Sequence, residues 1–301
     1  MTGVVLVGLW ALALAAGQAT GASGEVAQAA PAAGDPAAPS RVGEVITAEH
    51  DFAADAAALG INGSFNRWAA PGAIVIGSTG VLPVPVAYPP DVPKPEDEPS
   101  LVWWPNFAGV ALSGDLGFTT GGVEVGGRRA GHYFTIWSRQ ADGSWKWVFD
   151  GGSAASAADV PGPDTQPVIL QTSSRGSASP GEAMAEVDRA EQQLAARART
   201  DQKAAHLDVL LPSGRLYVAS LPPATGEAGF GEALDHWPDT FEFSPAEGGG
   251  ASSAGDLVWT YGRSGGGGYY VCLWQRQEAG WALAFTQMVP GRRPPAAAVE
   301  G

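Results

Sequence analysis

Three apolar, aromatic-rich runs between residues 113 and 150 form the clearest hydrophobic pattern in the chain. Two turn signals separate them: a glycine-rich stretch over 121–131 and the tripeptide Ala141-Asp142-Gly143. The Asp-Gly pair favours the positive φ of a tight hairpin. The spacing therefore predicts a meander of three antiparallel strands. The same pattern returns over 254–287, so the sequence predicts that the unit occurs twice.

The first meander follows segments in which apolar residues recur at the helical period. Residues 44–59 are predicted to form an amphipathic helix, and a second short helix is predicted to end at Trp68. Short strands are expected over 73–77 and 101–104, the latter ended by Pro105. Between them, residues 81–99 contain seven prolines and are expected to form a surface loop rather than a helix or central strand.

The second half repeats this order. Residues 182–199 form a predicted helix with acidic residues first and arginines last, as the helix dipole favours. Another helix is expected to reach about Leu210, a strand to cover 215–219, a helix 227–236 and a strand 241–243. Corresponding positions in the two halves are Ala48-Glu49 with Ala190-Glu191, Gly114-Asp115-Leu116 with Gly255-Asp256-Leu257, and Trp137 with Trp274. Each half is therefore predicted to be an α+β unit.

These patterns divide the 301 residues into consecutive parts. Residues 1–22 hold an apolar run followed by small residues, which is typical of a signal peptide and predicts a periplasmic or secreted protein without stable membrane insertion after cleavage. The run lacks a preceding Lys or Arg, so a short anchor or a misassigned start are alternatives. Two domains are predicted over 43–152 and 181–290, with linkers over 23–42 and 153–180 and a structureless tail over 291–301.

The first half carries a set of motifs in a fixed order. They are Leu101-Val102-Trp103-Trp104-Pro105 and the runs over 113–121 and 131–146. Together they resemble the DUF4440 group of the SnoaL-like, nuclear-transport-factor-2-like superfamily, and the second half resembles it as a degenerate copy. The resemblance implies two tandem cone-shaped units, each a curved antiparallel sheet wrapped around N-terminal helices with a pocket between them. This fold hosts isomerases, cyclases, hydrolases and non-catalytic binders, so it implies no single activity.

Both faces of the predicted strand over 131–139 are largely apolar. His132 and Phe134 lie on one face, and Tyr133 and Trp137 on the other. Helices of the same half can cover one face, whereas the other needs a second sheet. Single-domain members of the superfamily commonly pair through their sheets, so we expect the halves to form an intramolecular pseudo-dimer. The rival arrangement is two separate domains on a long linker.

Charge and cysteine content exclude several classes of function. The formal net charge of −14, with no basic cluster, disfavours nucleic acid as a partner. Cys272 is the only cysteine, so neither an intramolecular disulfide nor a cysteine-based metal site can form. No two histidines stand at ligand spacing with a carboxylate, so no metal site is expected. No cofactor motif is recognised.

Two titratable residues of the first half are candidate catalytic groups. Asp150 follows an aromatic run, on the predicted face of Lys146 and opposite Trp147. Beside an apolar cavity its pKa would rise, which suits proton abstraction next to a carbonyl; a solvated aspartate at a strand end is the simpler interpretation. His132 is the only histidine inside the meander, and either general acid–base chemistry or a hydrogen-bonded structural role fits it.

Four aromatic residues are candidates to line an apolar ligand pocket in the first half: Trp68, Trp104, Tyr133 and Trp137. Tyr133 and Trp137 recur in the second half, which is typical of core residues, whereas Trp68 and Trp104 do not. Asp115 and Asp256 also recur, which favours a turn-stabilising role over catalysis.

Three functional hypotheses follow. The first is a module that binds a small apolar or weakly polar molecule in the first half. The second is a cofactor-independent isomerase or cyclase that uses Asp150 with His132 or Tyr133. The third is a non-catalytic protein-interaction module of the cell envelope.

Overall fold

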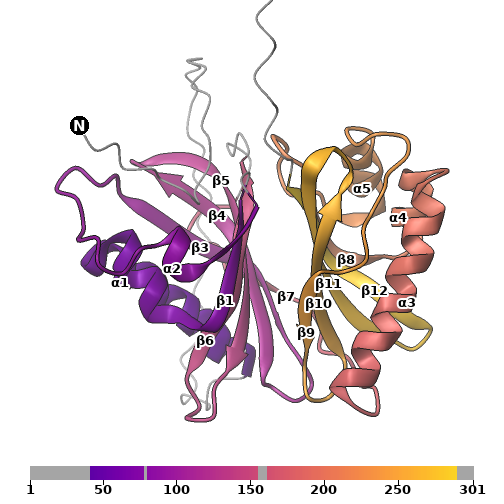
Figure 1. Ribbon diagram of the computed structural model, residues 1–301, viewed down its shortest axis with the longest axis horizontal. Coiled ribbons are helices and arrows are strands. Elements are labelled where there is room, and N and C mark those ends of the chain that lie inside the picture. The colour runs from indigo at the N-terminus through magenta and orange to yellow at the C-terminus, as the bar shows by residue number, and fades with distance from the viewer. Residues whose placement is uncertain (1–40, 78–79, 155–160, 290–301) are drawn as a thin grey trace, which may run out of the picture.

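The structure, a computed structural model, describes residues 41–77, 80–154 and 161–289. The predicted signal peptide, residues 23–40 of the first predicted linker and the predicted tail lie outside the described residues. The chain forms the predicted α+β architecture, with two curved sheets and helices along one face of each (Figure 1). No helix in the described ranges combines the length and the apolar character that crossing a membrane requires.

The first half begins with helix α1 (Arg41–Trp68), which contains both predicted helices. They meet at Gly60, which has a non-helical φ of 77° that only glycine adopts without strain. The buried stripe of α1 contains Val45, Phe52 and Phe65, and it also contains the carboxylate of Glu49. An ionisable group on a core-facing stripe requires hydrogen-bonding partners from the sheet.

The first sheet has the strand order β2-β1-β6-β5-β4-β3-β7. The predicted meander forms its centre as β4 to β6, and the only parallel pairs are β1 with β6 and β3 with β7. The elements are β1 (Ala69–Gly77), β2 (Gly80–Pro83), α2 (Val84–Ala87), β3 (Leu101–Val110), β4 (Leu116–Val125), β5 (Arg128–Arg139), β6 (Trp145–Ala154) and β7 (Val168–Ile169).

At two places the sequence predicted that proline would end or exclude regular structure, and the structure differs at both. Strand β3 runs through Pro105 to Val110, because a register shift between Pro105 and Phe107 accommodates the missing N–H in a bulge. The predicted loop over 81–99 contains part of β2 and the short helix α2, in which Pro85 occupies the first turn, where no N–H donor is needed. The expectation that proline excludes regular structure was wrong at these two places.

The second half repeats the arrangement with the strand order β8-β12-β11-β10-β9, and β8 runs parallel to β12. Its elements are α3 (Pro180–Ala198), α4 (Gln202–Leu207), β8 (Leu210–Tyr217), α5 (Gly226–Leu234), β9 (Gly248–Ala251), β10 (Leu257–Ser264), the 3-10 turn η1 (Gly265–Gly267), β11 (Gly268–Gln277) and β12 (Gly280–Val289).

The edge strand of the second sheet is not the one predicted. Residues 241–243 contribute only an isolated bridge between Phe243 and Ser264. The edge is β9, whose glycines pair with β10. A Cβ on Gly249 would lie 2.1 Å from the carbonyl oxygen of Trp259, so the close approach depends on glycine. Glycine runs usually argue against a strand, which is why the sequence pattern misplaced it.

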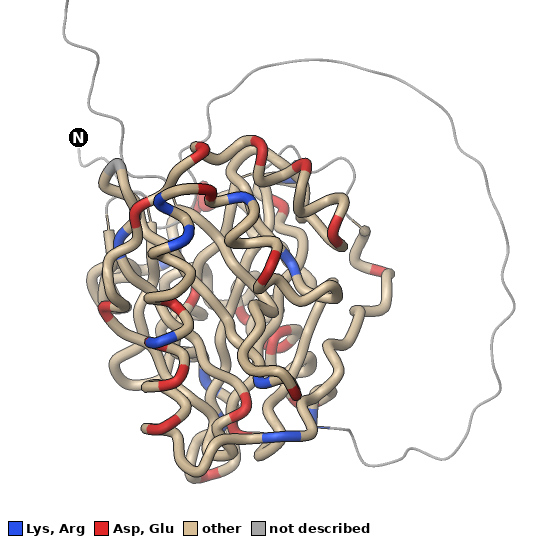
Figure 2. The backbone as a smooth tube through the Cα atoms, turned by 90° about the vertical axis from the view of Figure 1, so that its right-hand side faces the viewer, with Lys and Arg blue, Asp and Glu red and all other residues tan. Residues whose placement is uncertain are grey.

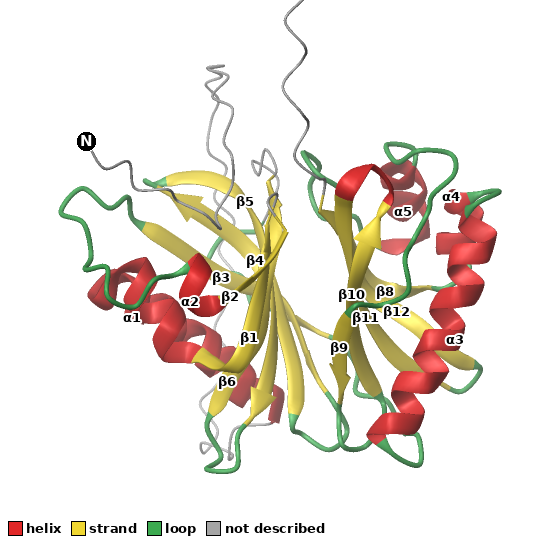
Figure 3. Cartoon of the chain, viewed as in Figure 1, coloured by secondary structure: helices red, strands yellow, loops and turns green. Residues whose placement is uncertain are grey.

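The two sheets face each other between outer layers of helices (Figure 3). Phe134 of β5 stacks on Phe285 of β12 with ring centroids 3.6 Å apart and planes 6° from parallel. The buried apolar cluster around this pair draws side chains from both halves, including Phe107, Phe118, Ile136, Phe149, Tyr217, Leu257, Trp259, Val271 and Leu273. The second apolar face of each sheet is therefore covered by the other sheet.

Reciprocal hydrogen bonds join the turns at the ends of the two sheets. The carboxylate of Asp115 accepts a hydrogen bond from the backbone N–H of Ser253 at 3.0 Å. Asp256 accepts one from the N–H of Leu112 at 2.8 Å. Positions 112 and 253 correspond in the two halves, so each aspartate makes the same contact with the opposite half. Both aspartates therefore join turns of opposite halves, in addition to the hydrogen bonds that Asp115 accepts from Ser113 and Asp256 accepts from Ser252 within their own turns.

Candidate functional site

A bulge in β6 decides the direction in which Asp150 points. Ile136 pairs with Phe149 and Trp137 pairs with Trp147, so Val148 is the extra residue. The shift places Asp150 on the same face as Trp147, toward α1. The simple alternation used on the sequence put it on the opposite face, and that expectation was wrong because alternation assumes a strand without bulges.

Asp150 is buried inside the first half. Its exposed fraction is 9%, and the Thr135 hydroxyl donates a hydrogen bond to its Oδ2 at 2.8 Å. Burial raises the pKa of Asp150 well above its ordinary value, and the nearby carboxylate of Glu49 raises it further. The raised pKa favours the protonated form of the carboxyl group, which can donate a hydrogen bond as well as accept one.

Glu49 is the second carboxyl group in this interior and is fully buried. It accepts hydrogen bonds from Trp103 Nε1 at 2.5 Å, from Trp137 Nε1 at 2.9 Å and from the Thr119 hydroxyl. These donors lower the pKa of Glu49, but the loss of solvent outweighs them and raises it to about 7. We call the group of buried residues formed by Glu49, Thr119, Tyr133, Trp147 and Asp150 the acidic cluster.

Two donors of the acidic cluster, Tyr133 Oη and Trp147 Nε1, are buried and have no partner within hydrogen-bond geometry. Leaving such a group unpaired in a protein interior costs about 1–3 kcal/mol. The Thr119 hydroxyl lies near enough to Tyr133 to lower the pKa of its phenol, against the larger effect of burial, which raises it. Trp147 is therefore the donor of the cluster that no described residue satisfies.

The predicted pocket residues occupy two different faces of the first sheet. Tyr133 and Trp137 face α1 as predicted for core residues, and half-buried Trp68 packs on them with its Nε1 donating to Asp55 at 2.7 Å. Trp104 is buried on the other side of its strand, where Nε1 donates to the carbonyl oxygen of Pro161 at 3.0 Å. The four aromatic side chains therefore do not line one common pocket.

His132 lies on the sheet face opposite to Asp150. Its ring packs on Tyr217 of the second half, with centroids 5.3 Å apart. Both ring nitrogens are buried without a hydrogen-bond partner, and burial lowers the pKa of His132 to about 4. The structure therefore does not bring His132 and Asp150 together, and of the two partners considered for Asp150 only Tyr133 shares its side of the sheet.

The second half contains a corresponding glutamate that is half-buried and has different surroundings. Glu191 of α3 accepts hydrogen bonds from Trp274 Nε1 at 2.9 Å and from the Thr260 hydroxyl, as Glu49 does from Trp137 and Thr119. Burial raises the pKa of Glu191. Its third donor, the Tyr270 hydroxyl, is more distant at 3.4 Å. Thr286 stands where the first half has Asp150.

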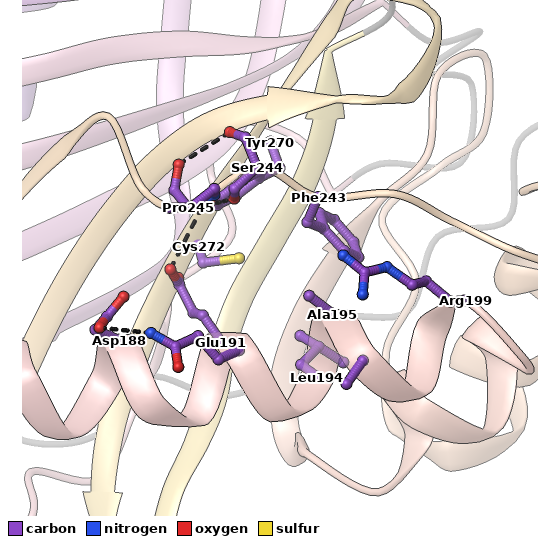
Figure 4. Close-up of a pocket in the computed structure, with 12 residues that line it drawn as sticks. Asp188, Glu191, Leu194, Ala195, Arg199, Phe243, Ser244, Pro245, Tyr270 and Cys272 are labelled. Carbon is purple, nitrogen blue, oxygen red and sulfur yellow. Dashed lines mark hydrogen bonds between the residues drawn. The ribbon is translucent and has the colours of Figure 1, made fainter.

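A cavity of about 240 Å³ opens beside Glu191. Figure 4 shows Glu191 directed from α3 toward Cys272 and Tyr270, with Leu194, Ala195 and Arg199 along the same helix. Phe243, Ser244 and Pro245 close the opposite side, and Asp188, Gln192 and Ala196 complete the wall. The wall combines apolar side chains with the half-buried Glu191 carboxyl group, the Tyr270 phenol, and polar or charged residues that include Ser244 and Gln192.

The two glutamates are the site residues that the sequence reasoning missed. Each was matched between the halves only as part of an Ala-Glu pair. The available signal was their position on the apolar stripe of a helix, where a carboxylate needs partners.

In the described residues no group of three or more histidine, cysteine, aspartate or glutamate side chains has metal-binding geometry. Acidic positions are distributed along the whole described tube, with basic ones scattered between them (Figure 2).

No family model and no curated protein sequence matches this chain. Among solved structures, an NTF2-like protein of unknown function from Pseudomonas putida is similar, with 11% identity, 39% of this chain and 93% of that chain covered, and a TM-score of 0.32. An NTF2-like protein with a cystatin-like fold from Novosphingobium aromaticivorans has 16% identity, coverages of 39% and 86%, and a TM-score of 0.30. A protein of unknown function with a cystatin-like fold from Nostoc punctiforme has 12% identity, coverages of 40% and 98%, and a TM-score of 0.31. Likenesses at this level assign no activity.

Glu49→Gln should remove a pH-dependent loss of stability. The folded state keeps the Glu49 proton up to about pH 7, whereas the unfolded chain releases it near 4.5. The stabilisation is therefore complete below pH 4.5 and disappears as the pH rises toward 7. This difference corresponds to about 3 kcal/mol. Between pH 4.5 and 8, urea unfolding should show the wild type losing about 3 kcal/mol more than Glu49→Gln.

The matched control is Glu227→Gln, which changes an exposed carboxylate at the start of α5. Its free energy of unfolding should follow the wild type at every pH. Parallel pH profiles for the wild type and Glu49→Gln would show that Glu49 ionises normally in the folded protein and would overturn the assignment.

Proposed function

We propose that the protein binds a small, weakly polar molecule in the cavity of its second half. The observation that carries this proposal is the cavity itself, about 240 Å³ between α3 and the sheet with the half-buried Glu191 carboxyl group in its wall. Ligand sites are typically concave, mostly apolar and supplied with a few fixed polar groups. The volume lies below the usual range for drug-sized ligands, so we expect a small one.

The residues that line the cavity limit the kind of ligand that it can bind. Glu191 Oε2 has only the distant Tyr270 hydroxyl as its hydrogen-bond donor, so it can accept another hydrogen bond. Phe243 and Cys272 offer apolar contact on the sheet side. A ligand with an apolar body and one hydroxyl or amide donor directed at Glu191 fits this arrangement. The original hypothesis placed the ligand in the first half, whereas this cavity lies in the second.

We further propose that the chain is a tandem member of the DUF4440, SnoaL-like group and that its halves act as an intramolecular pseudo-dimer. Support comes from the motif residues of β3 to β6, from the stacking of Phe134 on Phe285 and from the reciprocal bonds of Asp115 and Asp256. The apolar run at the N-terminus supports export to the periplasm or the medium.

Filling the cavity should abolish ligand binding. Ala195→Phe places a ring into the cavity from α3. Native mass spectrometry of protein purified from its own host should show a small-molecule adduct on the wild type and none on Ala195→Phe. The matched control is Gln193→Phe, an exposed position on the same helix that does not line the cavity. It should keep the adduct. A wild type without an adduct, or an adduct that survives Ala195→Phe, counts against the proposal.

Phe285→Ala tests the pseudo-dimer. Removing this buried ring should cost about 3–5 kcal/mol of unfolding free energy. If the halves unfold as one unit, hydrogen exchange should speed up in β5 of the first half as well as in β11 of the second. Phe230→Ala, in the helix-side core of the second half, provides a comparison for a change remote from the shared face. Unchanged protection of β5 in Phe285→Ala would support independent domains.

A further inference from the structure

The edge strand β9 of the second sheet corresponds to a covered part of the first sheet. Positions 112 and 253 are equivalent in the two halves, so Gly248–Ala251 of β9 corresponds to residues 107–110 of β3. Both segments pair antiparallel with the strand that follows them, in the same register. What covers this part of β3 therefore indicates what can bind along β9.

In the first half, an extended segment of the chain covers this edge. Val168 pairs with Phe107 and Ile169 pairs with Ala108, in a parallel arrangement. The backbone N–H of Leu170 then donates to the Ala108 carbonyl oxygen at 2.8 Å. Leu170 is buried, whereas the exposed fractions of Val168 and Ile169 are 55% and 46%. The segment is therefore held by backbone hydrogen bonds and by one buried apolar side chain.

The corresponding edge of β9 has no such cover. In the described part of the chain, no strand pairs with the outer side of β9, and Gly249 is exposed. Ser252 donates its N–H to the Leu257 carbonyl oxygen of the neighbouring strand at 2.9 Å, so the N–H of Ala251, one residue earlier, points away from that strand. Edge strands are commonly protected by charged residues or proline, but β9 consists of three glycines and an alanine. Its outer edge therefore offers backbone donors and acceptors to a further strand.

Two aromatic rings lie beside this edge. A Cβ on Gly248 would be 2.6 Å from Tyr261 Cε1, and one on Gly250 would be 3.0 Å from Trp259 Nε1, so both rings extend over the glycines of β9. The two rings are stacked, with centroids 6.0 Å apart. The residue of the first half that corresponds to Trp259 packs in one buried cluster with Leu170. Trp259 therefore offers the same kind of apolar contact to a side chain that takes the place of Leu170.

The charges near β9 favour a basic partner. Glu242 and Glu247 are exposed on the segment that leads into β9. Glu247 forms an ion pair with Arg263 at 2.6 Å, whereas Glu242 has no ion-pair partner among the described residues. In a strand that runs parallel to β9, the residues before the apolar position lie at this acidic end. Opposite charges at such a rim speed association and select the partner.

A second copy of the chain would gain little by pairing along β9. A stable interface between proteins buries about 1,200–2,000 Å² in total. A strand of four residues, three of them glycine, supplies few side chains to such an interface and none that fix a register. The aromatic rings and acidic residues around β9 instead suit a peptide that brings side chains of its own.

We propose that β9 is a docking site for an extended peptide segment of another protein, which adds to the second sheet as a parallel strand. The segment places one apolar side chain beside Trp259 and a lysine or arginine near Glu242. Its backbone hydrogen bonds provide affinity, and these two side chains provide selectivity. No residue of β9 lines the cavity beside Glu191, so this site is separate from the proposed ligand site.

The probe is a synthetic peptide with the sequence of residues 165–172, which includes the segment that covers β3, with lysine in place of its first residue. We expect saturable binding of the labelled peptide to the full chain by fluorescence anisotropy. The same peptide with glutamate in the first position should bind about threefold more weakly at low salt, because of Glu242 and Glu247. Saturating peptide should slow hydrogen exchange of the Ala251 amide, measured by NMR.

N-methylation of the peptide separates strand addition from apolar adhesion. A methyl group on the nitrogen of the peptide leucine, which corresponds to Leu170, removes its hydrogen bond to β9 and keeps its side chain. Binding should weaken about tenfold. N-methylation of the preceding isoleucine, whose N–H points away from β9 in a parallel ladder, should leave the affinity nearly unchanged. This comparison uses unchanged protein, so it does not depend on the folding of any variant.

Substitutions at Ala251 test the protein side of the contact. Ala251→Pro removes the outward N–H and should reduce peptide affinity about tenfold. Ala251→Val introduces the residue found at the corresponding position of β3, keeps the N–H and should bind the peptide as the wild type does. Ala195→Phe, which fills the cavity beside Glu191, should leave peptide binding unchanged. Failure of the proposed ligand site and failure of this docking site can therefore be told apart.

Several results would overturn the proposal. Absence of saturable binding, or equal affinity of the two N-methylated peptides, would show that β9 does not pair with an added strand. Peptide-induced NMR shifts in β3 instead of β9 would show that the peptide replaces the chain's own segment. Equal affinity of the lysine and glutamate peptides would overturn the preference for a basic partner.

Two further measurements identify the other possible occupants of this edge, and either would overturn the assignment to another protein. Tighter binding of the peptide, by about tenfold, to a chain that ends at Val289 would assign the edge to residues 290–301 of the same chain. A dimer that is lost in Ala251→Pro and kept in Ala251→Val, measured by analytical ultracentrifugation, would assign it to a second copy.

Discussion

Both faces of each curved sheet are apolar, and this constraint organises the whole molecule. One face of each sheet is covered by helices from its own half, and the other is covered only because the second sheet lies against it. Phe134 on Phe285 and the exchanged bonds of Asp115 and Asp256 are the direct contacts of that arrangement. Between its sheet and its helices, each half then holds either a pocket or packed side chains.

The interiors of the two halves share one set of hydrogen-bonded residues but differ in the residues around it. A glutamate on the core stripe of the first helix of each half accepts hydrogen bonds from a threonine and a tryptophan of the sheet. Because the pair recurs, the glutamates are best explained as structural groups that orient helix on sheet. We therefore associate function with the positions at which the two interiors differ. The first half adds a buried Asp150, whereas the second half has threonine at that position and leaves a cavity beside its glutamate.

The sequence pattern predicted the secondary structure well where that structure depends only on residues close together in the chain. The hairpin signal at 141–143 located one turn of the first meander, and the helical period located α1 and α3. Of the predicted turn over 121–131, only Gly126 and Gly127 lie between the strands. Errors arose where one residue broke a regular repeat. The extra residue at Val148 turned Asp150 inward, the bulge after Pro105 prolonged β3, and the glycines of β9 formed an edge strand. A bulge depends on the partner strand, so alternation along one strand cannot reveal it.

The sequence alone predicted that the chain is α+β and that its unit is repeated, because periodicity and repetition are properties of the chain itself. The expectation from net charge that nucleic acid is an unsuitable partner stays a prediction. The sequence also identified Trp137 and Tyr133 as core residues from their recurrence. Tertiary structure decided which carboxyl groups meet. Glu49 and Asp150 lie about a hundred positions apart and come together only because α1 packs on β6. It also separated His132 from Asp150 and brought Tyr88 into one buried cluster with Tyr133 and Trp147, since side chains distant in sequence meet only when the sheet curves around its helix.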